Sequence, residues 1–280
     1  MRRLEFFLRL KERKIALVGM AIIALLILVA ILAPFISPHD PVEQNLGQRL
    51  LGPGKQYPLG TDNLGRCVLS RIIYGARTSL SLGIIVVGVT TVGGTILGLI
   101  AGYRGGIVDQ IIMRLVDIMF AFPAIILAIA LAGVLGPGLS GILLAMVIVG
   151  WAGYARVVRG SVLSIKEKEY IEAARALGFS DQHIMVHHIL PNVMAPIIVM
   201  ATLSLAFIIL MVAGLGFLGL GAQPPTPDWG KMLTEGRPFM RTAPQLTVFP
   251  GLAIMVTAMA FIFLSEGLRE ALNPRREVAR

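Results

Sequence analysis

The chain has 280 residues and a mass of 30.1 kDa, and 56% of its residues are hydrophobic while 15% are charged. This composition excludes most soluble folds, because soluble domains average about 25% charged residues and need polar groups over most of their surface. The 25 Lys and Arg residues exceed the 16 Asp and Glu residues by nine, an excess that membrane proteins carry in cytoplasmic loops and that does not indicate a nucleic-acid partner. A single cysteine, Cys67, excludes an internal disulfide. The sequence predicts an all-α integral membrane protein.

Six stretches without charged residues are long enough for a helix to cross about 30 Å of hydrocarbon. The predicted spans are residues 15–35, 78–103, two spans within 118–155, 194–220 and 246–265. The first span is not read as a cleaved signal peptide, because its apolar run is too long and no A-x-A site follows. Gly136-Pro137-Gly138 predicts a tight turn between the third and fourth spans. At the start of the third span we expect Arg114 and Asp117, three residues apart, to form a pair on one helix face.

Lys and Arg are unevenly divided between the two sides of this arrangement. Seventeen lie in the tails and the connections after the second and fourth spans, and eight lie in the two remaining segments. Because Lys and Arg concentrate on the cytoplasmic side, both termini are predicted to be cytoplasmic. The predicted organisation is a cytoplasmic tail at 1–14, an external segment at 36–77, a five-helix core at 78–274 with a cytoplasmic loop at 160–193 and an external segment at 221–245, and a cytoplasmic tail at 275–280.

Three glycines in the second span, Gly94, Gly98 and Gly102, form two overlapping G-x-x-x-G steps. They leave one helix face without side chains, which lets a second helix approach closely. Helix packing is the prediction, and a permeation path along the same face is the alternative. Charged residues inside the spans are almost absent, which argues against a secondary transporter that must bind protons or sodium.

Motifs for catalysis are absent from the sequence. It contains no G-x-x-x-x-G-K-[ST] loop, so the chain is predicted not to hydrolyse ATP alone, and no G-x-S-x-G elbow. His183 and His187 have the spacing of a metal-binding pair, but Ile184 replaces the Glu of H-E-x-x-H and no third ligand is evident. A solvated helix face without metal is expected there.

The longest cytoplasmic loop contains two amphipathic pieces. In the first piece, Tyr170, Ile171, Ala174 and Leu177 recur at helical spacing and predict one apolar face. Gly178 follows as a residue that can adopt positive φ and end the helix.

The second piece is predicted to begin at Ser180, which can cap a helix with Asp181 in its first turn. It is predicted to end before Pro191, because the residue preceding proline disfavours the α conformation. The two pieces would form a bent helix pair on the membrane surface. The first piece, about 13 Å long, fits a groove in another protein or serves as a connector parallel to the membrane.

The sequence of this loop resembles the EAA signature of bacterial ABC-importer permeases. The sequence reads EAARALG, followed by LP, and the positions that match the signature are Glu172, Ala173, Ala174, Gly178, Leu190 and Pro191. His188 replaces a hydrophobic residue of the general signature, and H-I-L-P-N is usual in the peptide-importer branch. Residues 59–80 (LGTDNLGRCVLSRIIYGARTSL) and 215–233 (LGFLGLGAQPPTPDWGKML) are similar to two further segments of that branch. Cys67 stands where the family commonly has Asp, which puts in doubt an ion pair with Arg66 or Arg71.

The resemblance covers residues 57–274 and the first span, and it is greatest to the C-type permease of dipeptide, oligopeptide or nickel importers. It implies a type I ABC-importer permease in a bacterial or archaeal inner membrane, paired with a second permease, two ATPase subunits and an external solute-binding protein. ATP and Mg would be bound by the ATPases, and this chain would bind no cofactor. The rival functions are nickel import, a stand-alone channel or secondary transporter, and a binding scaffold.

The resemblance also assigns roles to individual residues. The residues implied in ATPase coupling are Glu169, Tyr170, Glu172, Ala173, Ala174, Arg175, Gly178, Leu190 and Pro191. Asp62, Arg66 and Trp229 are candidate contacts with the binding protein or another interface. Trp229 suits a membrane interface and a partner surface equally well.

Overall fold

The computed structural model describes residues 13–272, which form helices joined by loops, with an isolated β-bridge between Thr61 and Cys67. The C-terminal tail predicted at 275–280, and nearly all of the tail predicted at 1–14, lie outside the described residues. The longer helices are α2 (Lys14–Ile36), α3 (Val68–Arg104), α4 (Gly106–Phe120), α5 (Ala124–Leu135), α6 (Leu139–Lys166), α9 (Leu190–Phe217) and α11 (Gln245–Ala271). The shorter elements are η1 (Leu46–Gln48), α7 (Glu169–Ala176), α8 (Asp181–His183), η2 (Ile184–Ile189), α10 (Trp229–Gly236) and η3 (Arg237–Phe239).

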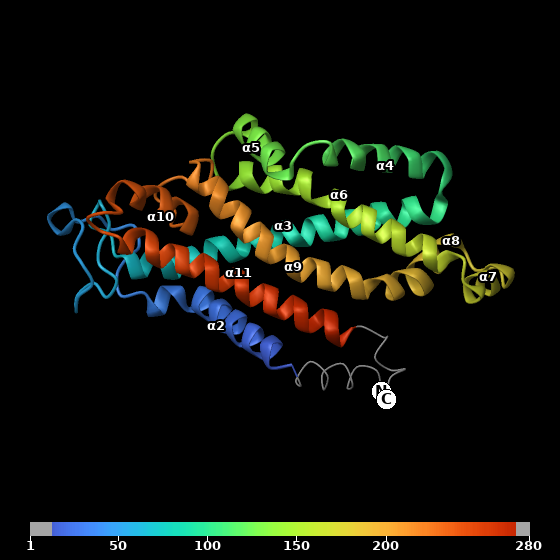
Figure 1. Cartoon of the computed structure of the whole chain (residues 1–280), viewed down its shortest axis with the longest axis horizontal. Coiled ribbons are helices and arrows are strands. Elements are labelled where there is room, and N and C mark those ends of the chain that lie inside the picture. The colour runs from blue at the N-terminus through green and yellow to red at the C-terminus, as the bar shows by residue number, and fades with distance from the viewer. Residues whose placement is uncertain (1–12, 273–280) are drawn as a thin grey trace.

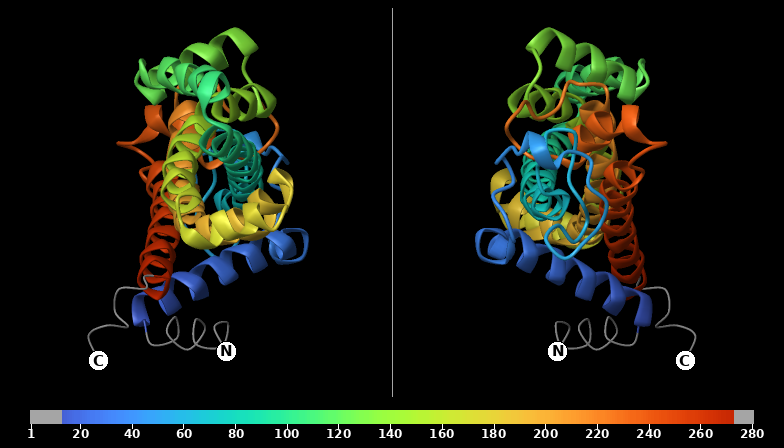
Figure 2. Two further views of the ribbon diagram at one scale, coloured as in Figure 1. Left: turned by 90° about the vertical axis from the view of Figure 1, so that its right-hand side faces the viewer. Right: turned by 90° about the vertical axis from the view of Figure 1, so that its left-hand side faces the viewer.

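The helices form an elongated bundle with different structures at its two ends (Figure 1). The loop between α2 and α3 and helix α10 lie at one end, and α7 and α8 lie at the other. Helix α2 lies on the opposite side of the bundle from α4 and α5 (Figure 2). Arg13, just before α2, pairs with Glu270 near the end of α11 at 2.9 Å. The N-terminal end of α2 therefore lies beside the C-terminal end of α11.

Within residues 13–272, five helical segments are long and apolar enough to cross a membrane, and α4 with α5 can supply a sixth as one bent span. The prediction of six spans agrees with this count, but the third span is not a single helix starting near Asp117. It consists of α4 and α5, bent by 90° at Ala121–Pro123. Pro123 lacks an N–H group and disfavours the α conformation at Phe122, which breaks the helix there. The Gly136–Gly138 turn is confirmed, with both glycines at positive φ.

Helix α3 is longer than the predicted second span, 78–103, because it begins at Val68. Its 37 residues extend about 55 Å at 1.5 Å per residue, well beyond a hydrocarbon core of about 30 Å. The additional turns contain Ser70 and Arg71, which are buried. Hydropathy placed the start of α3 too late because it excludes polar residues from a membrane span. Ser70 and Arg71 belong to the helix because other parts of the protein bury them.

The predicted glycine stripe of α3 packs directly on α6. A Cβ atom at Gly94 would lie 2.5 Å from the Tyr154 Cβ, and one at Gly98 would lie 2.5 Å from the Ala155 carbonyl oxygen. At Gly102 the same atom would lie 2.8 Å from the Val162 Cβ. Any side chain at these positions would therefore separate the two helices, so the prediction of helix packing is confirmed.

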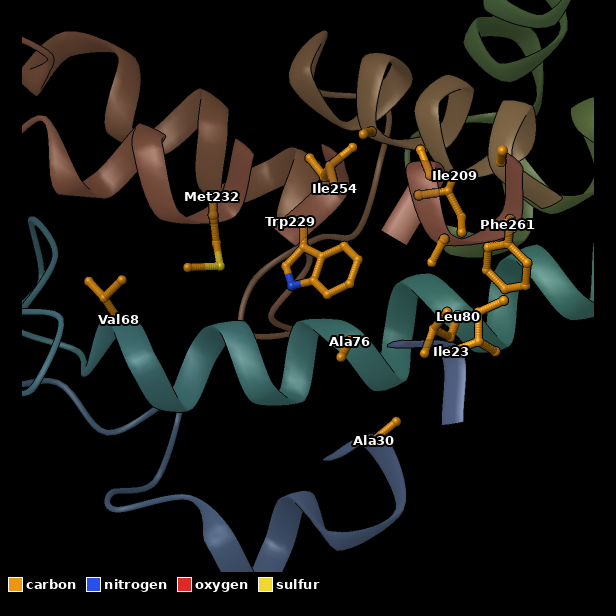
Figure 3. Close-up of a cluster of buried hydrophobic side chains, with 14 of the residues drawn as sticks. Ile23, Ala30, Val68, Ala76, Leu80, Ile209, Trp229, Met232, Ile254 and Phe261 are labelled. Atoms are coloured by element: carbon orange, nitrogen blue, oxygen red, sulfur yellow. The ribbon is translucent and has the colours of Figure 1, made fainter. Parts of the chain in front are cut away.

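The largest apolar cluster joins α3 to α9, α10 and α11 near the end of the bundle that carries α10. Trp229 lies at its centre between Val68 and Ala76 on α3 and Met232 on α10 (Figure 3). The indole is 1% exposed, and its N–H donates to the Ile72 carbonyl at 3.0 Å. Neither location considered for Trp229 from the sequence, a membrane interface or a partner surface, agrees with this burial.

The helix that begins at Asp181 does not end before Pro191. It continues through η2, a π-helical segment, into α9, so that Asp181–Phe217 is one helical run. The wider π turn shifts the hydrogen-bond register, with the Leu190 N–H donating to the Met185 carbonyl, and Pro191 then falls in the first turn of α9, where its missing N–H costs little. The prediction of two helices lying on the membrane surface is therefore wrong for the second helix.

Candidate functional site

Helix α7 projects from the end of the bundle opposite α10 (Figure 1). One of its faces is buried and the other is exposed. Ile171 and Ala174 are buried, 0% and 4% exposed, and they pack in one cluster with residues of α3, α6, η2 and α9. Tyr170 and Leu177 were predicted to share this apolar face, but they are 41% and 76% exposed. The bundle contacts one edge of the apolar stripe, which leaves the other edge uncovered.

The C-terminal end of α7 is a closed turn. Gly178 has φ of +82°, as predicted, and its N–H donates to the Arg175 carbonyl at 2.9 Å while the Phe179 N–H donates to the Ala174 carbonyl at 3.2 Å. This pair of bonds is a Schellman motif, which requires a residue that tolerates positive φ at its turn. The predicted cap at Ser180 is also present, since its hydroxyl accepts the His183 N–H at 3.3 Å.

Sequence reasoning missed the residue that holds this turn to the bundle. The Tyr103 hydroxyl donates to the Asp181 carboxylate at 2.7 Å, and the Arg175 guanidinium lies 5.4 Å from the centre of the Tyr103 ring. Tyr103 is the penultimate residue of α3. An aromatic residue beside Arg104 at the end of a span was the available signal. The contacts join α7 and α8 to a helix that runs the length of the bundle.

The other residues with a predicted coupling role are divided between two places. Glu169, Glu172, Ala173 and Arg175 are exposed on α7 beside Tyr170. Leu190 and Pro191 lie at the junction of η2 and α9, where Leu190 packs against the cluster that holds α7. The structure therefore provides an exposed face on α7 and, beneath it, a support that includes Leu190.

Histidines predicted to form a solvated helix face pack against each other beside α7. The rings of His183 and His187 stack at 4.3 Å between centroids, and Phe179 stacks on His183 at 4.8 Å. His187 is exposed. These contacts connect α8 and η2 to Phe179, which follows the end of α7.

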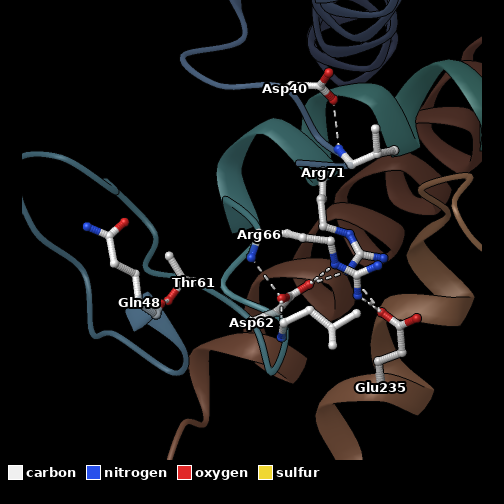
Figure 4. A network of polar contacts seen from close by, with 9 residues as sticks. Asp40, Gln48, Thr61, Asp62, Arg66, Arg71 and Glu235 are labelled. Carbon is white, nitrogen blue, oxygen red and sulfur yellow. Dashed lines mark hydrogen bonds and ion pairs between the residues drawn. The ribbon is translucent and has the colours of Figure 1, made fainter. Parts of the chain in front are cut away.

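A buried network of ion pairs occupies the opposite end of the bundle (Figure 4). Arg66 binds Asp62 at 2.7 Å and Glu235 at 2.8 Å. Arg71 binds Glu235 at 2.9 Å and also pairs with Asp62. Two arginines thus share two carboxylates and tie the loop before α3 to helix α10.

Arg66 and Arg71 have carboxylate partners although Cys67 stands where the family commonly has Asp. The thiol is buried and free, and Asp62 supplies the carboxylate that pairs with both arginines. Asp62, Arg66 and Trp229 were candidates for external contacts, but they are 6%, 3% and 1% exposed. They stabilise the fold internally and present almost no surface to a partner in this structure.

Two further ion pairs connect α4 to α6. Asp117 pairs with Arg156 at 2.8 Å. The predicted pair of Asp117 with Arg114 is therefore wrong. Asp109 pairs with Arg159 at 2.5 Å. The tertiary contact replaces the expected pair within one helix, since α6 brings its guanidinium alongside α4.

A bundle of five or six membrane-spanning helices with one short helix projecting at its end is the fold of a type I ABC-importer permease. A chain of the MetNI methionine ABC transporter in an inward-facing conformation matches with a TM-score of 0.60 at 18% identity, over 72% of this chain and 96% of that chain. An amino acid ABC transporter solved with histidines matches with a TM-score of 0.57 at 15% identity, over 72% and 94%. At these identities the likeness concerns the fold alone.

The chain belongs to the family of binding-protein-dependent transport system inner membrane components, which it matches over residues 94–278. Residues 4–53 also match the N-terminal transmembrane domain of oligopeptide transport permease C. The dipeptide transport system permease protein DppC of Alkalihalophilus pseudofirmus is 48% identical over 271 residues, covering 97% of this chain and 89% of that protein. DppC of Haemophilus influenzae is 43% identical and covers 97% and 94%. The glutathione transport system permease protein GsiD of Pectobacterium atrosepticum is 43% identical and covers 97% and 90%. The resemblance found in the sequence is confirmed.

Proposed function

We propose that this chain is the permease subunit of an ATP-driven importer that moves short peptides across a bacterial inner membrane. The observation that carries the proposal is 48% identity to a dipeptide permease over 97% of the chain. The relative at 43% identity is named as a permease for glutathione, which is also a short peptide. This favours a peptide over nickel as the substrate. The complete importer would contain a second, homologous permease, two ATP-binding subunits that hold ATP and Mg, and an external solute-binding protein.

In this proposal the exposed face of α7 docks into the ATPase and transmits its movement to the spans. Tyr170 and Leu177 provide exposed apolar contact area. Glu172 and Arg175 are exposed charged residues on the same helix. The cluster around Ile171 and the Tyr103 contact with Asp181 would let α7 move with α3, α6 and α9. Such rigid transfer is how a small displacement at a docking site turns helices in a packed bundle.

The proposed orientation places both termini and α7 in the cytoplasm. The division of Lys and Arg, seventeen against eight, supports it. The pairing of Arg13 with Glu270 is consistent with an even number of spans. Helix α10 and the loop before α3 would then face the binding protein.

The coupling role can be tested in the assembled importer with Glu172→Lys and Gly178→Asp. Both variants should lose peptide uptake and transport-stimulated ATP hydrolysis, while the external protein still binds its peptide. Glu266→Lys is the matched charge reversal, because Glu266 is exposed on α11 and its ion-pair partner among the described residues is Arg269 at 2.6 Å. Wild-type uptake by both α7 variants would refute the coupling role.

The substrate requires a separate measurement. Membrane vesicles containing the complete importer should take up labelled dipeptides in an ATP-dependent manner, and unlabelled dipeptide should compete. Uptake of Ni²⁺ without competition by peptide would support the nickel alternative instead.

A further inference from the structure

The last turn of α3 holds the segment that precedes α7. The Lys166 ammonium, at the end of α6, donates to the Gly102 carbonyl oxygen at 3.0 Å. The last carbonyl groups of a helix have no partner within that helix, and they form the negative end of its dipole. An ammonium group is therefore favourable there, and its bond joins α6 to α3 at the end of the bundle that carries α7 (Figure 1).

The glycine stripe of α3 explains why Lys166 reaches this carbonyl. Gly102 is the last glycine of the stripe, and a Cβ atom there would lie 2.8 Å from the Val162 Cβ. Val162 is fully buried and precedes Lys166 by four residues, so both lie on the same face of α6. The close approach of the two helices at Val162 therefore brings the next turn of α6 within reach of the end of α3.

The segment that follows α7 is attached to the neighbouring residue of α3. The Tyr103 hydroxyl donates to the Asp181 carboxylate at 2.7 Å, and the Arg175 guanidinium lies 5.4 Å from the centre of the Tyr103 ring. Because Gly102 and Tyr103 are consecutive, one turn of α3 binds the chain on both sides of α7. The attachment points are Lys166 before the helix and Asp181 after it.

The connection from α6 to α7 transfers any movement of Lys166 to α7. Two residues separate Lys166 from Glu169, where α7 begins. The Lys168 N–H donates to the Ile165 carbonyl at 3.1 Å, and the Lys168 carbonyl accepts the Ile171 N–H at 2.9 Å. Backbone hydrogen bonds therefore link the last turn of α6 to the first turn of α7, and the two turns keep their relative position.

We propose that Lys166 is a positioning residue for the coupling of ATP hydrolysis to transport. The inference rests on the proposed function, because it takes the exposed face of α7 as the surface that docks into the ATPase. Lys166 fixes the first turn of α7 on the last turn of α3, while Tyr103 fixes the segment after α7, so that α7 and α3 move as one body. With the Tyr103 contact alone, α7 would turn about its C-terminal end, and part of the movement would not reach α3.

The test measures the number of peptides transported per ATP hydrolysed by the complete importer in proteoliposomes. Lys166→Met keeps the aliphatic length but has no donor, and Lys166→Gln is shorter and uncharged. Each variant should lower the number of peptides per ATP by about threefold, because a hydrogen bond from a charged group is lost at one end of α7. Lys166→Arg keeps a charged donor and should restore most of the wild-type value.

Lys168→Met is the matched control, because it removes the same charge from an exposed side chain two residues further along. It should leave the number of peptides per ATP unchanged. A purely structural role of Lys166 would lower the unfolding temperature or the amount of assembled importer, but not the number of peptides per ATP in the complexes that assemble.

Three results would refute the inference: wild-type coupling in both neutral variants of Lys166, an equal loss in Lys168→Met, or no recovery in Lys166→Arg. A failure of the proposed function would be seen separately, since the wild-type importer would then show no ATP-dependent uptake of peptide.

Discussion

Gly75 lies directly beneath the indole of Trp229. A Cβ atom at Gly75 would be 2.7 Å from the Trp229 Cδ1 atom and 2.8 Å from its Nε1 atom. The same nitrogen donates to the Ile72 carbonyl, one turn earlier on α3. The absence of a side chain at Gly75 therefore lets α10 pack against α3 at the end of the bundle that we propose is external.

Gly75→Ala is expected to destabilise the protein by about 1–3 kcal/mol, because the buried indole cannot move away from an added methyl group. The measurement is the unfolding temperature of the detergent-purified chain. Gly88→Ala is the control on the same helix, where a Cβ atom would meet nothing within 4 Å; its unfolding temperature should be unchanged or higher. Equal stability of the two variants would contradict the packing described for Trp229.

Asp62→Asn should destabilise the same end of the bundle more strongly, by about 3–5 kcal/mol, because it leaves Arg66 and Arg71 with one carboxylate between them in a buried site. Protease resistance of the loop before α3 is expected to fall together with the unfolding temperature. Glu43→Gln removes a charge from an exposed position of that loop and should change neither property. A variant at Asp62 as stable as the wild type would show that Glu235 alone neutralises both arginines.

Tyr103→Phe removes the hydroxyl that donates to Asp181 and leaves the ring in place. We expect a loss of about 1 kcal/mol in stability, together with weaker coupling of ATP hydrolysis to uptake in the assembled importer. The number of peptides transported per ATP is the quantity to measure. Tyr74→Phe, at the opposite end of α3, is the control. An unchanged ratio in Tyr103→Phe would mean that the apolar cluster around Ile171 is sufficient to hold α7.

Asp228 gives a pH-dependent contribution to stability. Burial raises the pKa of its carboxyl group, although the N–H of Lys231 and the hydroxyl of Ser79 oppose the shift. The folded chain therefore binds this proton more tightly than the unfolded chain, whose Asp has a pKa of about 3.9. The resulting stabilisation is present at low pH and is lost as the pH rises from about 4 through the raised pKa.

Asp228→Asn should remove this dependence, because the amide oxygen still accepts the capping N–H of Lys231 and carries no charge. The difference in unfolding temperature between wild type and variant is therefore expected to change as the pH rises from about 4 through the raised pKa, with the wild type losing stability relative to the variant. Parallel unfolding curves across this range would contradict the burial of an ionisable carboxyl at Asp228.

Local patterns were sufficient for the elements that depend on nearby residues. The apolar runs predicted α2 and α11 to within a few residues at most of their ends, because transfer into lipid depends on the composition of one segment. The end of α7 at Gly178 was predicted for the same kind of reason, since a positive φ is a property of a single residue. The glycine stripe of α3 correctly predicted close helix packing, because a helix face without side chains lets a second helix approach.

Contacts between distant segments were predicted poorly. Asp117 was paired with Arg114 because that cation is near it in the sequence. In the structure, α6 places Arg156 beside Asp117. Trp229 was assigned to a surface, yet it fills the space left by Gly75, 154 positions earlier in the sequence. Pro191 was taken as a helix end because proline was considered without the π turn that accommodates it.

The sequence by itself determined the class of this protein, the number of spans, the projecting helix and the family, since hydropathy, local dihedral preferences and a contiguous motif are all properties of neighbouring residues. The tertiary structure decided which charges pair, which aromatic side chains are buried and where the third span bends. These outcomes depend on the packing of segments that are far apart in the chain, where the cost of an unpaired buried charge or an empty space falls on the whole bundle and not on any one segment.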